Sequence, residues 1–136
     1  MSFAPCVKEL RDGWFPHTTD AGLKRLITLL DSGSPLLVHG TFTKSLPMGC
    51  LATHIAWHHP ATQKMTHDAG VIWLSHIAGL NPATSLVIRA WDEGGQANWD
   101  LRNLILAACR EEWLDRADRN AGLTDDYQDA LPALTA

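Results

Sequence analysis

The chain has few basic residues and no long apolar run. Its 136 residues include 11 Lys and Arg against 15 Asp and Glu, a formal net charge of −4, and the basic residues are scattered. Nucleic-acid binding proteins carry clustered basic charge, so nucleic acid is not an expected partner. No apolar run approaches the ~20 residues that span a bilayer, and the first eight residues do not resemble a secretory leader. We expect a cytoplasmic protein without a membrane segment.

Cysteine is scarce as well. Cys6, Cys50 and Cys109 are odd in number and far apart, which excludes a disulfide framework and fits buried thiols in a reducing compartment. What the chain does have is apolar bulk, because 46% of its residues are hydrophobic, six of them Trp, and only 19% are charged. This balance and length are typical of one globular domain with one hydrophobic core.

Helical spacing dominates the apolar pattern, and the sequence predicts an all-α fold, a single compact domain of about five helices arranged as an orthogonal bundle. The helices are expected over residues 20–32, 49–59, 67–78, 82–91 and 98–120. Residues 35–40 are short and apolar, and are expected to be either extended or a short turn. The domain covers residues 1–122, followed by an acidic C-terminal tail over 123–136.

The helix over 82–91 is apolar on most sides, which predicts a place at the centre of the bundle. Asn81 would cap it, with Pro82 in its first turn. Trp73, Trp91 and Trp99 are expected in or near the core. Residues before Thr18 read as a loop with an exposed Trp14.

Cys50, His54 and His58 follow one another at four-residue spacing, which on one helix spans roughly 80° of its surface. Thiolate and imidazole are ligands that zinc prefers, so the stripe predicts a zinc site, with His67 as the first candidate for a further ligand. His59 and Asp68 are alternatives for that position. This interpretation makes the protein a metal-binding or histidine-based small enzyme. The alternative is that Cys50 and His54 are small buried groups whose polar atoms bind the backbone.

Residues Leu36 to Val38 lead into the triplet His39-Gly40-Thr41, which resembles the first nicotinamide-binding element of ADP-ribosyltransferases. The resemblance implies a fold with several further strands and an acidic catalytic residue on a late strand. Gly49-Cys50-Leu51, together with the later run Ile88 to Asp92, is similar to small bacterial or phage-type helical domains of unknown function.

The last expected helix changes character midway. Its apolar stripe of Leu101, Ile105 and Ala108 is continued by charged residues, so the helix outruns its own core. Glu112 and Arg116 are spaced for an ion pair, and Trp113 lies beside them. Trp and Arg are enriched at protein interfaces, so these three residues are the predicted interface. The preferred hypothesis is a non-enzymatic interaction or regulatory module whose partner is another protein or a second copy of the chain.

Overall fold

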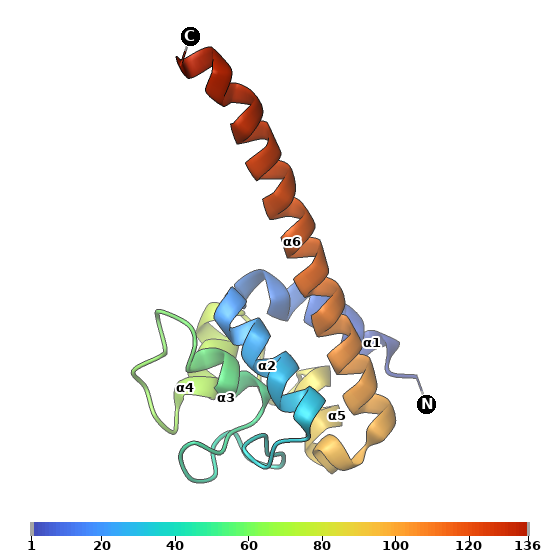
Figure 1. Cartoon of the computed structure of the whole chain (residues 1–136). Coiled ribbons are helices and arrows are strands. Elements are labelled where there is room, and N and C mark those ends of the chain that lie inside the picture. The colour runs from blue at the N-terminus through green and yellow to red at the C-terminus, as the bar shows by residue number, and fades with distance from the viewer. Residues whose placement is uncertain (1, 136) are drawn as a thin grey trace.

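The computed structural model describes the backbone of residues 2–135 and the side chains of residues 2–120. Within these bounds the chain forms six α-helices and no strand, which confirms the all-α fold (Figure 1). The helices are α1 (Ala4–Glu9), α2 (Asp20–Ser32), α3 (Leu51–Ala56), α4 (Ala69–Ile72), α5 (Leu86–Gly94) and α6 (Trp99–Thr135). Four short turns connect them: the π-helical η1 (Leu10–Trp14) and η3 (Trp73–Ile77), and the 3₁₀ turns η2 (Phe15–His17) and η4 (Gly95–Ala97).

Helix α2 is the best predicted element. The Thr19 side chain accepts a hydrogen bond from the Gly22 amide at 3.0 Å, and Gly33 ends the helix in the left-handed conformation with φ of 62°. An L-residue with a Cβ rarely adopts that conformation, so glycine suits this position. The apolar face of α2 is buried against α3 and α6, and comprises Leu23, Leu26, Leu29 and Leu30.

The N-terminal segment differs from the expected loop, because residues 4–17 are helical throughout. Trp14, predicted to be exposed, is fully buried. Its ring lies edge-on to Trp73 with centroids 5.5 Å apart, and its indole N–H donates to the Glu9 carboxylate at 3.0 Å. A buried indole needs such a partner for its N–H. The prediction failed because three short helical turns present no long periodic pattern.

The sequence predicts Asn81 as the N-cap of α5. In the structure the N-cap is Ser85, and the helix begins at Leu86. Ser85 caps its own helix through the Ile88 amide, and Glu9 accepts from the Leu86 amide at 2.9 Å and the Val87 amide at 3.2 Å. The carboxylate of Glu9 therefore satisfies amides that a helix leaves unpaired at its N-terminus, where negative charge is favoured.

The predicted central place of α5 is also wrong. Val87, Ile88 and Trp91 are buried, but Leu86 is 44% exposed and Arg89 faces solvent. The helix therefore has one buried face, and its exposed apolar residue explains why its sequence pattern looked apolar on most sides.

Helix α3 is shorter than the predicted 49–59. It ends at Ala56, whose carbonyl accepts from the Thr62 hydroxyl at 2.7 Å, and the chain turns over residues 57–62. The predicted helix over 67–78 is divided into α4 and the π-helical η3, and it ends at Gly79 as expected. Gly70 lies so close to α3 that a Cβ there would meet the Thr53 Oγ1 at 2.1 Å.

Residues 35–40 are held by single bridges and form no sheet. Leu37 pairs with Gly49 in an isolated parallel bridge, and the Val38 amide donates to the Gly49 carbonyl at 2.9 Å. The Trp91 indole N–H donates to the Val38 carbonyl, also at 2.9 Å. The extended interpretation is therefore correct at this point, and α5 stabilises it.

Helix α6 begins after Asn98, as predicted, and Asn98 accepts from the Leu101 amide at 3.2 Å. Its buried residues include the predicted stripe of Leu101, Ile105 and Ala108. Trp99, expected near the core, is 65% exposed and lies against the Arg102 guanidinium instead. The helix continues past the predicted end near Asn120 to Thr135 and extends away from the body (Figure 1). The predicted acidic tail, residues 123–136, lies outside the part of the chain whose side chains the structure describes.

Replacing Glu9 with Gln should destabilise the fold. The amide keeps one acceptor oxygen and directs an NH₂ group at donors that the carboxylate now satisfies, so the free energy of unfolding should fall by about 1–3 kcal/mol. Urea denaturation measures the change. Glu111→Gln, which removes an exposed ion pair with Arg11, is the control and should stay within about 0.5 kcal/mol of the original chain. Equal losses in the two variants would contradict this role of Glu9.

Candidate functional site

The first half of the predicted zinc stripe is buried. Cys50 precedes α3 and is 2% exposed, and its Sγ lies 3.7 Å from the Thr53 hydroxyl. His54 is 1% exposed, and its Nε2 lies 2.8 Å from the Leu36 carbonyl oxygen. Its ring is edge-on to Trp57, with centroids 5.2 Å apart. Both residues are therefore buried, as the alternative interpretation predicts, and His54 has a backbone partner, whereas the Cys50 Sγ lies beside a side-chain hydroxyl.

The charge state of His54 follows from this environment. Burial lowers the pKa of His54; the hydrogen bond to Leu36 opposes the shift, and the positive charges of Arg25 and His58 add to it. The ring is therefore neutral at neutral pH, and its Nε2–H donates to the carbonyl. His54 thus joins α3 to the extended segment at residues 35–40.

The second half of the stripe is exposed. Because α3 ends at Ala56, His58 no longer continues the helical stripe, and its carbonyl accepts from the Thr19 hydroxyl at 2.6 Å. His67 lies in the exposed loop before α4, and its carbonyl accepts from the Thr43 hydroxyl at 3.0 Å. Neither of the alternative ligands, His59 and Asp68, completes a cluster. Among the side chains of residues 2–120, no three His, Cys, Asp or Glu are placed to hold one metal ion. The zinc site stays a prediction, and the structure does not assemble a ligand set for it.

The three cysteines are buried free thiols, as expected for residues that do not form disulfides. Burial raises the pKa of Cys50 and of Cys6, and it raises the pKa of Cys109 to about 12. Nucleophilic cysteines have a lowered pKa and an accessible sulfur. These thiols have the opposite properties and serve as packing groups.

The triplet His39-Gly40-Thr41 lies in a loop that packs against the end of α5. The Asp92 carboxylate accepts from the Gly40 amide at 3.0 Å, and the His39 ring covers Gly95 so closely that a Cβ there would lie 2.4 Å from Nδ1. The strands that the ADP-ribosyltransferase resemblance implies are not formed by residues 2–135, so that fold is wrong for this chain.

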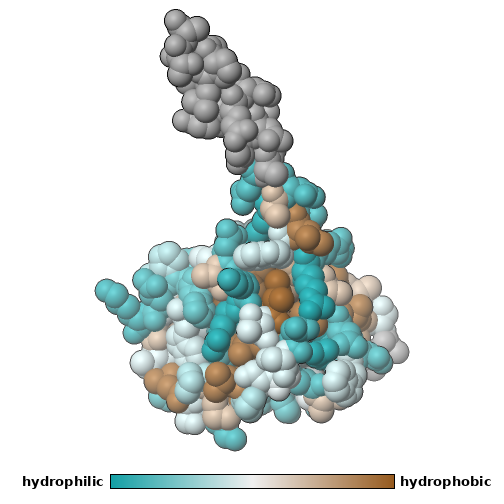
Figure 2. Space-filling view, in the orientation of Figure 1, coloured by the Kyte–Doolittle hydropathy of each residue, from teal (hydrophilic) through white to brown (hydrophobic). Residues whose placement is uncertain are grey.

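Two neighbouring large apolar side chains are exposed where α6 leaves the body. Leu114 is 64% exposed and Trp113 is 37% exposed. They border a hollow of about 430 Å³ between α2 and α6. In the space-filling view, apolar side chains are framed by hydrophilic ones in the region where these two helices meet (Figure 2). We call this region the α2–α6 surface; its lining residues are Lys24, Ile27, Thr28, Arg110, Trp113 and Leu114.

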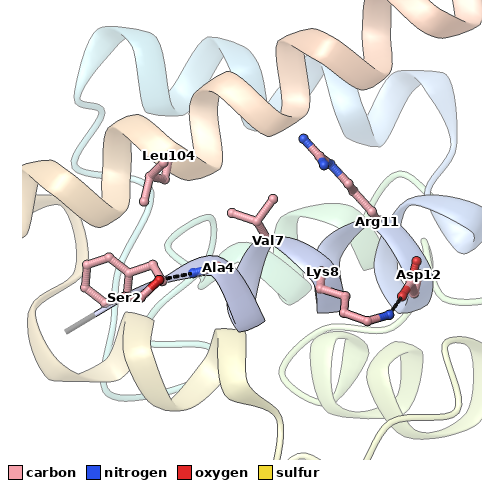
Figure 3. A pocket seen from close by; sticks show the side chains of 8 residues that line it. Ser2, Ala4, Val7, Lys8, Arg11, Asp12 and Leu104 are labelled. Carbon is pink, nitrogen blue, oxygen red and sulfur yellow. Dashed lines mark hydrogen bonds and ion pairs between the residues drawn. The ribbon is translucent and has the colours of Figure 1, made fainter.

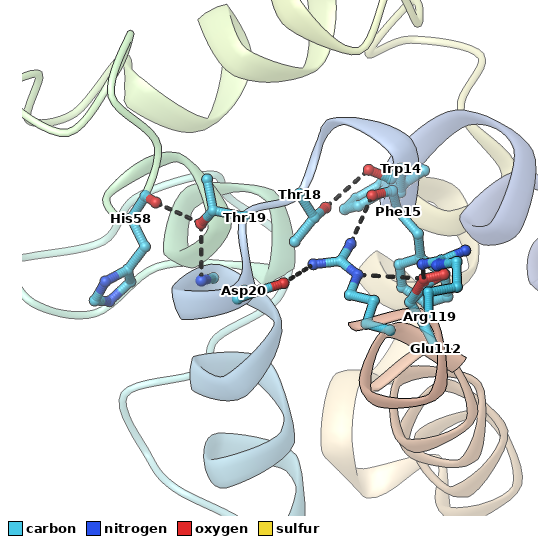
Figure 4. Close-up of polar contacts among 10 residues, drawn as sticks. Trp14, Phe15, Thr18, Thr19, Asp20, His58, Glu112 and Arg119 are labelled. Carbon is cyan, nitrogen blue, oxygen red and sulfur yellow. Dashed lines mark hydrogen bonds and ion pairs between the residues drawn. The ribbon is translucent and has the colours of Figure 1, made fainter. Parts of the chain in front are cut away.

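Arg116 and Glu112, two members of the predicted interface, hold α6 to the body. The Arg116 guanidinium donates to the Asp20 carboxylate at 2.8 Å, to the Phe15 carbonyl at 2.8 Å and to Glu112 at 3.3 Å (Figure 4). Its side chain is 14% exposed and that of Glu112 is 17% exposed. Both side chains therefore have partners within the molecule, and Trp113 is the predicted interface residue with the most exposed apolar surface.

Sequence reasoning missed Leu114, Ile27 and Lys24. Leu114 follows Trp113 directly and lies off the buried stripe, which was the available signal for an exposed apolar residue on α6. Ile27 follows the buried Leu26 on α2 at helical apolar spacing, yet the structure leaves it partly exposed beside Trp113. Lys24 carried no signal, because only the packing of α2 against α6 places it at the hollow.

A second hollow, of about 560 Å³, lies between α1 and α6 (Figure 3). Val7 and Leu104 face it, and Lys8 and Asp12 on its rim form an ion pair with each other. It reaches Ser2, beside Met1, which is outside the described residues. The α2–α6 surface is the better candidate, because two large neighbouring apolar side chains, Trp113 and Leu114, are exposed at it.

Lowering the pH should destabilise the folded chain through His54. The unfolded side chain has a pKa near 6.5 and the folded one a lower pKa, so below pH 6.5 the unfolded state binds more protons. Stability is then fully present above pH 6.5 and falls as the pH decreases, by up to about 1.4 kcal/mol per pH unit for one group. Partial desolvation and the positive charge of Arg25 also lower the pKa of His58, so this group changes the stability in the same direction.

Urea denaturation between pH 5 and 8 measures this slope. His54→Gln retains a side-chain N–H for the Leu36 carbonyl but cannot titrate, so its slope below pH 6.5 should be shallower. An unchanged slope in this variant would show that other groups cause the acid sensitivity.

Arg116→Gln should loosen α6 without unfolding the body. The substitution removes the hydrogen bonds that the guanidinium donates to Asp20 and to the Phe15 carbonyl. A hydrogen bond with a charged donor contributes about 1.5–3 kcal/mol to stability. Amide hydrogen exchange should increase over residues 110–120 and stay unchanged in α2. Arg119→Gln is the matched control, since Arg119 is 65% exposed and lies 3.7 Å from Glu112. Faster exchange throughout the chain would instead indicate global destabilisation.

The chain has no match among family models, curated proteins or solved structures. Its function is therefore inferred from the side chains and surfaces described above.

Proposed function

We propose that this chain is a non-enzymatic protein-interaction module that docks its partner on the α2–α6 surface. The observation that carries the proposal is the exposure of two large neighbouring apolar side chains, Trp113 and Leu114, beside a hollow. Trp is among the residues that contribute most to binding when it becomes fully buried at the centre of an interface. A partner that covers this surface would remove both side chains from water.

The surface is also held in place before a partner arrives. At one end of the hollow, Arg116 binds Asp20 at the start of α2. At the other end, the Arg110 guanidinium donates to Asp31, near the C-terminal end of α2, at 2.7 Å. Two helices joined at both ends of a hollow lose little freedom on binding. Such preorganisation raises affinity by lowering the entropic cost of association.

The distribution of reactive side chains supports a binding role. Cys50, Cys109 and His54 are buried. Burial raises the pKa of the two thiols and lowers the pKa of the imidazole, and both shifts favour the neutral form. The hollows described between α1, α2 and α6 are lined by no histidine or cysteine among residues 2–120. Cys50, Cys109 and His54 thus pack the interior, and the hollows offer apolar and charged contacts.

Photo-crosslinking in the cells that naturally make this protein tests the proposal. A benzophenone amino acid at position 114 should give one discrete crosslinked protein, identified by mass spectrometry. The same group at position 46 is the control, because Leu46 is 49% exposed but lies in a loop away from α6. Trp113→Ser should lower the affinity for the partner by about 30-fold, as expected for a central interface residue, and should therefore weaken the crosslink. No product, or the same products from both positions, would refute a docking role for this surface.

A further inference from the structure

We infer that the partner segment is an amphipathic helix with carboxylates flanking its apolar stripe; this inference rests on the proposed docking function of the α2–α6 surface. It follows from two features of the surface. One is the arrangement of its hollows along α6, and the other is the placement of positive charge at its two ends.

The surface continues along α6 into a second hollow of about 540 Å³. The two hollows meet at Arg110 and Leu114, and the second is floored by Leu106 and Ala107. Leu106 and Leu114 are eight residues apart on one helix, which places them about 12 Å from each other. Apolar side chains seven or eight residues apart on a partner helix have the same spacing, so a helix lying along α6 can fill both hollows.

Positive charge without a carboxylate partner lies at each end of this surface. Lys24 is exposed at the first hollow, and none of the ion pairs among residues 2–120 includes it. Arg102 lines the second hollow and donates to the carbonyls of Leu30 and Asp31, but to no carboxylate. Both cations lie beside apolar surface, where a carboxylate on a docked helix would find a partner.

The acidic residues that line the second hollow already have basic partners. Asp31 is paired with Arg110, and Glu111 is paired with Arg11, each at 2.7 Å. The remaining charge on the surface is thus positive, although the chain as a whole carries −4. Electrostatic complementarity of this kind selects an acidic partner and disfavours a basic one. Leu114, which lines both hollows, and Arg102 are 12 residues apart on α6, which corresponds to roughly 18 Å along the helix.

Fluorescence anisotropy with two designed peptides tests this inference on the full chain. Both are labelled 18-residue helices with leucines at every third or fourth position; one has glutamates flanking the leucines and the other has lysines at the same places. The glutamate peptide should bind at least about tenfold more tightly at low salt, and the difference should shrink in 0.5 M NaCl as salt screens the charges. Lys24→Glu should remove the preference, whereas Lys64→Glu, an exposed lysine distant from α6 in sequence, should preserve it.

Equal affinity for the two peptides, or a preference that survives Lys24→Glu, would overturn the acidic-helix inference. If a crosslink at position 114 still forms, the docking function stands and only the partner chemistry is wrong. A dimer that sediments at micromolar concentration and dissociates in Leu114→Asp would assign the surface to a second copy and likewise overturn the inference. Loss of the position 114 crosslink, by contrast, refutes the docking function itself.

Discussion

The carboxylate of Glu9 is the contact on which the core depends. It accepts hydrogen bonds from the Trp14 indole, from the Ser85 hydroxyl and from two amides at the start of α5. The ring of Trp14 in turn lies edge-on to Trp73 in η3. One side chain near the N-terminus therefore fixes where α5 begins and how the central tryptophans pack. In a chain built from helices as short as α1 and α4, this long-range contact supplies order that local helix propensity does not.

The position of α6 depends on a second polar centre. Apolar packing holds α6 to the body through Leu101, Ile105 and Cys109, and beyond these residues the apolar stripe stops. Arg116 takes over by binding Asp20 and the Phe15 carbonyl. Because Trp113 and Leu114 lie between the last buried apolar residue and Arg116, they are held at the edge of the body and remain in contact with solvent. The same arrangement that extends the helix thus creates the apolar surface.

The elements that sequence predicted well are those with local signals. Thr19 and Gly33 delimit α2, and Asn98 marks the start of α6, each through contacts within a few residues. The failures involve contacts that no helical repeat encodes, one between residues 77 positions apart and one across six residues at the end of α3. Glu9 selects Ser85 over Asn81 as the start of α5, and Thr62 closes α3 early. No local pattern records either contact, so they appear only when the chain is folded.

The same difference between local signals and long-range contacts decides which residues of the candidate site could be predicted from sequence. Trp113 was identified from the helix pattern, whereas Lys24 reaches the surface only through the packing of α2 on α6. The zinc stripe required α3 to continue through His58, and its early end separates the buried His54 from the exposed His58.

Burial distinguishes the predicted metal ligands Cys50 and His54 from the exposed apolar residues of the α2–α6 surface. A neutral histidine or thiol can enter the core at little cost when it has a hydrogen-bond partner or packs as a small apolar group, and His54 and Cys109 have done so. A large apolar side chain left at the surface has no such compensation until another molecule covers it. Trp113 and Leu114 remain partly exposed on a rigid base, beside a lysine with no ion pair among residues 2–120. The proposed docking site is therefore the region between α2 and α6, where exposed apolar side chains and this lysine lie together.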